Sequence, residues 1–232
     1  MFERPFDEET VAALTADLLE QCEKVQNLVS VGRLQVKGWG GRDFEAAVFC
    51  AWIPSPLKIK IELTHPWGQP ILYVLVDGEV FRFLSFYDRR FYTGYFADRS
   101  LSKFLPGDVN TSFIKDLARA YPVIDAEYRT HSHWPNQISF YERGEELKIV
   151  TFDRDIRRPV EVAIPQSNTK LVFSDFKAVK GLWFAQETAL IHVLGGRRLL
   201  HSIETAVFNR TLPEELFSLQ APPGFETISI PP

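Results

Sequence analysis

Apolar and polar residues alternate with a period of two over much of this sequence, from about residue 31 to residue 208. The segment from Leu57 to Leu63 is the clearest example, because it places four aliphatic side chains on one face of an extended chain. The run from Phe44 to Trp52 has the apolar character of a buried strand, and Asp77-Gly78 is a strong signal for a tight hairpin turn. This pattern predicts a meander of antiparallel strands.

Two segments break this rhythm with apolar residues at helical spacing. The first runs from Asp7 to about Val29 and has Asp7 as its expected N-cap, and the second runs from Thr111 to Tyr121, where Pro122 ends it. We therefore expect a mainly β (α+β) fold, in which a curled antiparallel sheet of about eleven or twelve strands forms an unclosed half-barrel with a long N-terminal helix and a short lid helix. No linker or repeat divides the chain, so residues 1–232 are expected to form a single domain.

Composition excludes several classes of protein. The chain has 232 residues, of which 45% are hydrophobic and 13% aromatic, which is enough apolar surface to offset the entropy of folding. The formal net charge of −4 gives no basic field for nucleic acid. No run of apolar residues is long enough to span a membrane, and no signal peptide is visible at the start of the sequence.

The sequence offers little for catalysis. It contains no nucleophile elbow, phosphate-binding loop or dinucleotide fingerprint. His131 and His133 could share one face of an extended chain as two metal ligands, but no neighbouring Cys or carboxylate completes a site, so we interpret them as solvated loop residues. Cys22 and Cys50 are interpreted as small core residues, with a disulfide between them left open. We expect no cofactor and no enzymatic activity.

A curled sheet of this size has more apolar face than two helices can fill, so we expect a cleft walled by aliphatic and aromatic side chains. An error of one residue in the strand register would move these residues to the outer face of the sheet. The expected wall residues are Leu34, Val36, Val48, Ile59, Ile61, Leu72, Val74 and Phe81, and the expected lid residues are Phe113, Ile114 and Leu117.

Trp67 lies at the tip of a predicted turn, between Pro66 and Gly68. A tryptophan in this position either folds back on the sheet or points into solvent, and turn chemistry alone favours neither. If it points outward, its amphipathic ring suits a membrane interface or an apolar partner.

Three stretches of the sequence resemble the bacterial lipoprotein-sorting family of LolA and LolB. Residues 27–34 are similar to the family's passage from the helix to the first strand, and residues 63–68 are similar to the Asn-Pro-Leu-Gly turn of LolB. Residues 217–224 resemble the ending of LolA-type members. The stretch from Trp52 to Pro56 lacks the arginine that tethers the lid in LolA-type carriers, and the chain lacks a lipobox cysteine.

The resemblance implies an unclosed barrel that holds acyl chains in its concave face, in the cell envelope of Gram-negative bacteria. It places Trp67 at the position whose hydrophobic side chain helps deliver cargo into the membrane, and so favours an outward Trp67. The expected function is thus a periplasmic lipid- or lipoprotein-binding protein, tethered to the outer membrane by an N-terminal lipid outside this sequence, with acyl chains and the membrane surface as its partners.

Two alternatives stay open from the residues. The concave face could dock a peptide or a partner domain in place of a lipid, in which case an unpaired strand edge is expected. The chain could also be an enzyme on a β-scaffold that uses His131 and His133.

Overall fold

A computed structural model describes residues 4–38, 43–95, 111–155, 157–165 and 167–230. The protein is mainly β, as the alternation predicts, and its two α-helices are α1 (Glu8–Glu23) and α2 (Thr111–Arg119). The first set of strands is β1 (Leu28–Lys37), β2 (Phe44–Ile53), β3 (Lys58–Thr64), β4 (Pro70–Asp77), β5 (Val80–Ser85) and β6 (Arg90–Tyr95). The second set is β7 (Arg129–His131), β8 (Gln137–Glu142), β9 (Glu145–Phe152), β10 (Pro159–Ala163), β11 (Thr169–Val179), β12 (Leu182–His192) and β13 (Arg197–Phe208), followed by the short 3₁₀ helix η1 (Glu214–Phe217) and β14 (Glu226–Ile230).

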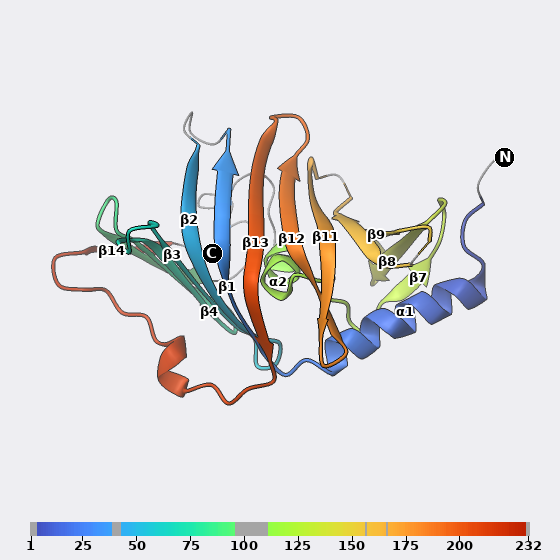
Figure 1. Ribbon diagram of the computed structural model, residues 1–232, viewed down its shortest axis with the longest axis horizontal. Helices are drawn as coiled ribbons and strands as arrows, with labels where there is room; N and C mark the ends of the chain where they lie inside the picture. Colours follow the sequence, from blue (N-terminus) through green and yellow to red (C-terminus); the bar gives the residue numbers. More distant parts are fainter. Residues whose placement is uncertain (1–3, 39–42, 96–110, 156, 166, 231–232) are drawn as a thin grey trace.

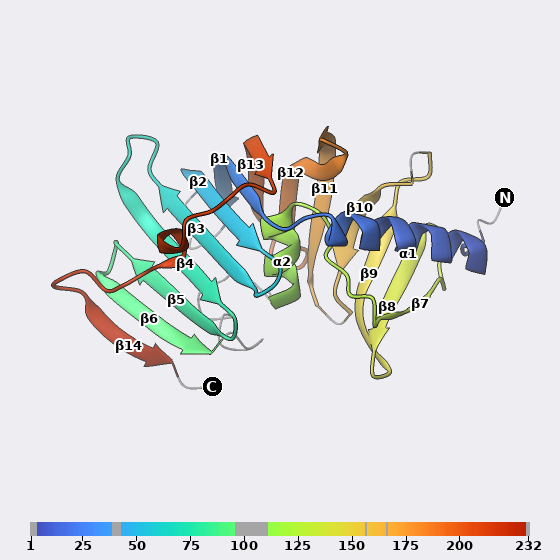
Figure 2. The same cartoon turned by 90° about the horizontal axis from the view of Figure 1, so that it is seen from below.

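All of these strands belong to one curved sheet, whose hollow face holds both helices (Figures 1 and 2). The strand order is β14-β6-β5-β4-β3-β2-β1-β13-β12-β11-β10-β9-β8-β7, so β1 and β13 join the two halves of the chain. The sheet is not closed into a barrel, which confirms the half-barrel, but the described residues form 14 strands in it and not eleven or twelve. The expectation missed β7, which has only three residues, and β14, which pairs with β6 in parallel and follows a turn-rich segment.

Helix α1 begins where the sequence predicts. Asp7 is its N-cap, because its carboxylate accepts a hydrogen bond of 2.8 Å from the backbone N–H of Thr10, and this bond lowers the pKa of Asp7. Val11, Leu14 and Leu18 are its buried residues.

The prediction that this helix continues to Val29 is wrong. Helix α1 ends at Glu23, and Val29 already lies in β1. The side-chain amide of Asn209 stops the helix, because its oxygen accepts from the N–H of Gln26 at 2.7 Å and its nitrogen donates to the carbonyl of Lys24 at 2.8 Å. These bonds use backbone groups that another turn of helix would need. Asn209 is distant in sequence, so no local pattern could predict that the helix ends here.

Helix α2 stands in the hollow of the sheet, while α1 lies along the side formed by β7 to β10 (Figure 2). It is two residues shorter than expected, because Ala120 has a positive φ of 52° and turns the chain out of the helix before Pro122. Among the described residues, no helix is long and apolar enough to cross a membrane.

The C-terminal segment covers part of the outer face of the sheet (Figure 1). Phe217 of η1 packs there with Ala51 and Leu75 in a small core separate from the main one. The main core lies inside the hollow and includes residues of both helices and of both halves of the sheet.

The seam between the two halves of the sheet is irregular. The pairing of β1 with β13 contains a bulge between Val31 and Gly32, opposite Glu204. Only glycine fits at position 32, because a Cβ atom there would lie 2.0 Å from the carbonyl oxygen of Ser202. Beyond Ser202, β13 continues along β1 but no longer pairs with β12, whose last partner is Glu187. The first residues of β12 and the last residues of β13 are therefore separated from each other.

Candidate functional site

The register of the strands places all eight expected wall residues on the hollow face. Cross-strand neighbours share a face, and the pairs Ile59–Val76, Ile61–Val74 and Val76–Phe81 link β3, β4 and β5. The remaining wall residues are connected in the same way through the pairs Leu34–Ala46, Val36–Phe44, Val48–Leu63 and Leu63–Leu72. We call this surface, with Leu34, Val36, Val48, Ile59, Ile61, Leu72, Val74 and Phe81, the inner wall.

Much of the inner wall is part of the main core. Ile59 and Phe81 are fully buried, whereas Ile61, Leu72 and Val74 are only partly buried. Phe113 and Ile114 of α2 are buried in the same core, and Leu117 packs against it. The three expected lid residues therefore do face the sheet, and α2 fills the hollow as a plug.

A buried ion pair fixes α2 to the second half of the sheet. Lys148 of β9 lies 2.9 Å from the Asp116 carboxylate, and the side chains of both residues are at most 2% exposed. Asp116 also accepts from the N–H of Val123 at 2.7 Å, and Lys148 donates to the carbonyl of Val123 at 2.9 Å. Burial raises the pKa of Asp116, while Lys148 and the Val123 N–H act in the opposite direction. This cluster holds α2, the loop after it and β9 together.

Arg119, the last residue of α2, is the second buried charge of this helix. It is 1% exposed, and its Nη1 donates to the carbonyl oxygen of Trp183 at 2.9 Å. Its guanidinium carbon lies 5.4 Å from the ring centre of Tyr121 and 5.1 Å from that of Phe208. Its Nε and Nη2 are buried and have no hydrogen-bond partner in the part of the chain that the structure describes. Burial lowers the pKa of Arg119 to about 10, so it stays charged at neutral pH.

His201 of β13 and Thr188 of β12 face each other across the strands beside the plug. Both are buried, and within the described ranges His201 Nε2 and Thr188 Oγ1 have no hydrogen-bond partner. Burial lowers the pKa of His201 to about 4, so the imidazole is neutral at physiological pH.

Two cavities are lined by residues that contact Arg119, although Arg119 itself lines neither. The first, of about 280 Å³, lies under α1 and includes Tyr121, Trp183 and Arg158, whose guanidinium carbon is 3.6 Å from the centre of a Trp183 ring. The second, of about 400 Å³, lies where β12 and β13 separate. We call it the seam cleft; its residues are Lys24, Val179, Lys180, Leu182, Ala206, Val207, Phe208 and Asn209. None of the expected wall residues lines either cavity.

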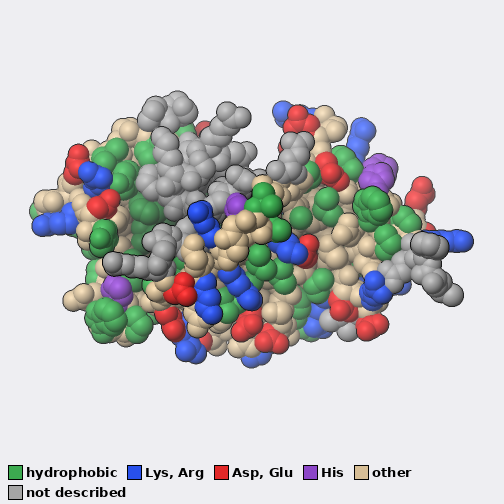
Figure 3. Space-filling view, turned by 90° about the horizontal axis from the view of Figure 1, so that it is seen from above, with side chains coloured by type: hydrophobic (Ala, Val, Ile, Leu, Met, Phe, Trp, Pro, Cys, Tyr) green, Lys and Arg blue, Asp and Glu red, His purple; other side chains and the backbone are tan. Residues whose placement is uncertain are grey.

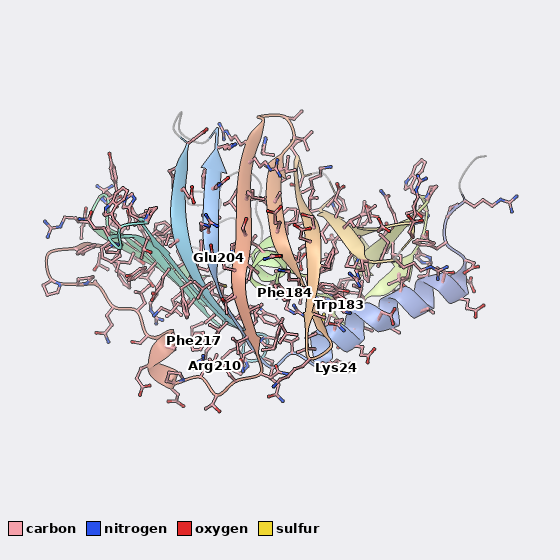
Figure 4. All side chains as sticks on the ribbon, viewed as in Figure 1. Lys24, Trp183, Phe184, Glu204, Arg210 and Phe217 are labelled. Carbon is pink, nitrogen blue, oxygen red and sulfur yellow. The ribbon has the colours of Figure 1, made fainter. Side chains whose placement is uncertain are left out.

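Figure 4 shows the outer side of this region, with Trp183 and Phe184 on β12, Glu204 on β13 and Lys24 near the end of α1. Phe184 belongs to a small apolar cluster with Ala120 and Ile203. Val179, Ala206 and Phe208 pack against this cluster and also line the seam cleft. The chain at the end of α2 therefore lies behind three of the residues that line the cleft.

Trp67 lies in the turn between β3 and β4 and is 70% exposed. Its ring stacks on that of His65, with 4.3 Å between the ring centres and an angle of 6° between the planes. The indole therefore points away from the core.

The surface seen from above in Figure 3 carries acidic and basic side chains side by side.

The other candidate residues form no larger site. The rings of His131 and His133 lie 5.9 Å apart, and within the described ranges no group of three His, Cys, Asp or Glu residues could hold a metal ion. Cys22 and Cys50 are both free. Burial raises the pKa of Cys50 to about 12, and the Cys22 thiol lies 3.6 Å from the carbonyl oxygen of Pro122.

Sequence reasoning missed Asp116, Arg119 and Lys148. Asp116 and Arg119 alternate with the apolar residues of a short helix, a pattern that normally indicates a solvent-facing side. Lys148 lies in an alternating strand, where a lysine is normally expected on the exposed face. No local signal marks these three residues as buried, because their burial depends on the helix being enclosed by the sheet.

The sequence matches no protein-family model and no curated protein. The structure is similar to a proposed outer membrane lipoprotein-sorting protein domain from Vibrio parahaemolyticus, with a TM-score of 0.62, 12% identity and coverage of 91% of this chain and 97% of that one. It is also similar to a DUF1329 family protein from Desulfovibrio piger, with a TM-score of 0.64, 12% identity and coverage of 90% and 96%. A third similar structure is a LolA superfamily protein from Nitrosomonas europaea, with a TM-score of 0.56, 12% identity and coverage of 88% and 97%.

The chain has the LolA-like fold. The similarity extends over about nine tenths of the chain, and it confirms the fold that three short sequence stretches suggested. At 12% identity it establishes the fold alone.

Proposed function

We propose that this protein binds acyl chains of lipids or lipoproteins on the inner wall, where an acyl chain replaces the apolar contacts that the plug α2 makes with this wall. The observation that carries the proposal is the shared face of eight apolar residues from five strands, on which α2 packs Phe113 and Ile114. An acyl chain replaces such apolar contacts directly, and each buried methylene contributes about 0.8 kcal/mol. A site of this kind needs apolar walls and a movable cover, and no catalytic residue.

The fold supports the same proposal. Two of the similar structures carry names that connect them with lipoprotein sorting or with the LolA superfamily. By analogy with these proteins, we propose that the chain acts in the bacterial envelope as a non-enzymatic binding protein. We further propose a periplasmic location, a tether to the outer membrane by an N-terminal lipid, and a contact of Trp67 with the membrane surface. Residues 1–232 would act as one domain.

Titration with a fluorescent fatty-acyl probe, together with native mass spectrometry, tests the binding. Val74 and Val80 provide a matched pair, because both are partly buried valines on neighbouring strands. Val74 is on the inner wall, whereas Val80 pairs with Asp77 on the other face. We expect Val74→Gln to weaken probe binding and Val80→Gln to leave it unchanged. Equal effects of the two substitutions, or no binding by the wild type, would contradict the proposal.

A second candidate function is the docking of a peptide or a partner domain. Strand β14 is at one end of the strand order, and among the described strands it pairs only with β6, so its other edge could add a strand from a partner. Crosslinking in envelope extracts distinguishes the two functions. Recovery of one protein partner without lipid would favour docking over lipid binding.

A further inference from the structure

The most unusual group in this molecule is the guanidinium of Arg119. Among the described residues, no carboxylate pairs with it, although it is 1% exposed. Part of its positive charge is compensated by the C-terminus of α2 and by the carbonyl oxygen of Trp183. The aromatic rings of Tyr121 and Phe208 compensate a further part. Buried charges are normally paired, so a buried arginine with two free donors requires an explanation.

The two free donors, Nε and Nη2, are placed to bind one anion together. Nε and Nη2 lie along one edge of the planar guanidinium, and their N–H bonds point in the same direction. This is the edge that binds the two oxygens of a carboxylate or a phosphate in parallel hydrogen bonds. Nη1, on the opposite edge, is the nitrogen that already donates to Trp183. Within the described residues, Nη1 is therefore hydrogen-bonded to the protein, and the bidentate edge formed by Nε and Nη2 has no partner.

The seam cleft lies next to this group. Phe208 lines the cleft, and its ring centre is 5.1 Å from the Arg119 guanidinium carbon. Ala120, the residue after Arg119, belongs to the apolar cluster against which Val179, Ala206 and Phe208 pack. The cleft volume of about 400 Å³ is in the range of small-molecule sites, and most of the side chains that line it are apolar. A cation beside an apolar cleft fits a ligand that has one anionic end and one apolar end.

We propose that the seam cleft binds a single-chain amphiphile, whose carboxylate or phosphate occupies the Nε and Nη2 edge of Arg119. The apolar tail lies between β12 and β13 against Leu182 and Ala206, and the Phe208 ring turns aside to admit the anion. This site is separate from the inner wall, so it goes beyond the proposed function and would select ligands by charge. Lys180 also lines the cleft, but it is exposed and is not part of the proposed anion site.

Binding of a matched series of C12 ligands tests the proposal. Displacement of a fluorescent fatty-acid probe gives the affinities of laurate, dodecyl phosphate and uncharged dodecanol. We expect the wild type to bind the two anions about 10- to 100-fold more tightly than dodecanol, as hydrogen bonds to a charged group imply. In Arg119→Met this ratio should fall close to one while the affinity for dodecanol is retained.

Two further variants separate this role from a purely structural one. Arg119→Lys keeps the charge but loses the bidentate edge, so we expect an intermediate preference for the anions. Lys180→Gln removes the cation at the surface of the cleft, and the ratio should stay within about twofold of that of the wild type, since such exposed charges contribute little. Circular dichroism and thermal unfolding of each variant confirm that it is folded.

Several outcomes would overturn the proposal. If the ratio of anion affinity to dodecanol affinity is the same in the wild type and in Arg119→Met, Arg119 only positions α2. If Lys180→Gln loses the preference for anions, the anion binds at the surface of the cleft and not at Arg119. Competition by inorganic phosphate as strong as that by dodecyl phosphate would indicate a site for free anions and not for amphiphiles. None of these results affects acyl binding on the inner wall, which the Val74→Gln variant tests separately.

Discussion

The two arms of the sheet bury different kinds of residue on their hollow faces. In the arm formed by β1 to β6, the inner wall is aliphatic and aromatic, and Ile61, Leu72 and Val74 are only partly covered. In the arm formed by β7 to β13, the hollow face also buries Lys148, Thr188 and His201. The two buried charged residues of α2, Asp116 and Arg119, contact this second arm.

This difference assigns separate tasks to the two arms. Polar contacts are directional and costly to break when buried, so the β7–β13 arm determines where α2 sits. Apolar contacts are non-directional, and a lipid can replace them without leaving an unpaired group. Under the proposed function, the β1–β6 arm is therefore the surface on which a ligand exchanges with the plug. The predictions below test this division, beginning with the largest expected effect.

Breaking the buried ion pair should destabilise the protein most. Asp116→Asn leaves the ammonium of Lys148 buried without a counter-charge, so we expect a loss of about 3–5 kcal/mol in the free energy of unfolding. Chemical denaturation measures this loss. Glu204→Gln is the control, because Glu204 pairs with Arg33 on the surface at 2.8 Å and both side chains are more than half exposed. This variant should change stability by at most about 1 kcal/mol. If both variants behave alike, the buried pair does not anchor α2.

Acid should destabilise the β7–β13 arm through His201. The folded pKa of about 4 is below the ordinary value of 6.5, so the unfolded chain binds the proton more readily between these two pH values. Stability from this group is complete above pH 6.5 and is lost as the pH falls toward 4, by about 3 kcal/mol in all. Unfolding measured across this range should show a smaller pH dependence in His201→Gln. An unchanged pH dependence would mean that His201 is not buried as a neutral group.

The seam between the arms should tolerate no side chain at position 32. A Cβ atom in Gly32→Ala would meet the Ser202 carbonyl oxygen at 2.0 Å, so β1 and β13 must shift apart at the bulge. We expect a loss of about 1–3 kcal/mol, as for other overpacked sites, measured by thermal or chemical unfolding. A variant as stable as the wild type would show that the strands are not in close contact at the bulge.

The smallest expected effect concerns the proposed contact between Trp67 and the membrane surface. Trp67 is 70% exposed beside the β1–β6 arm, and Trp134 is 68% exposed in the turn between β7 and β8. If the β1–β6 arm exchanges ligand with a bilayer, Trp67→Ser should reduce co-sedimentation with phospholipid vesicles by a few-fold. The matched variant Trp134→Ser should have no effect. Equal effects of the two variants would remove the special role of Trp67.

The sequence contains enough information for the fold of the sheet but not for its polar contacts. The alternation in Leu57–Leu63 and the Asp77-Gly78 turn are local signals, and they predict strands and a hairpin that the structure confirms. The early end of α1 depends on Asn209, nearly two hundred residues away.

The inner wall could be predicted because strand register follows from alternation, but the seam cleft could not. The cleft lies where β13 stops pairing with β12, just before a bulge at Glu204 that shifts the register by one residue and has no turn signal in the sequence. The burial of Arg119 likewise follows from the enclosure of α2 and not from its own neighbours. The two sites therefore differ in how far sequence alone can reveal them.

Photo-crosslinking with a neutral diacylglycerol that carries a diazirine on one acyl chain tests the central claim most directly. The ligand lacks the anion that Arg119 would bind, so it favours the inner wall over the seam cleft, and the position of the label distinguishes the two sites. After irradiation, peptide mapping by mass spectrometry should place the label on β3, β4 and β5, at or beside Ile61, Leu72 and Val74. Labelling confined to outer-face residues such as Leu75, or the absence of any specific label, would contradict the assignment of the β1–β6 arm as a lipid-binding surface.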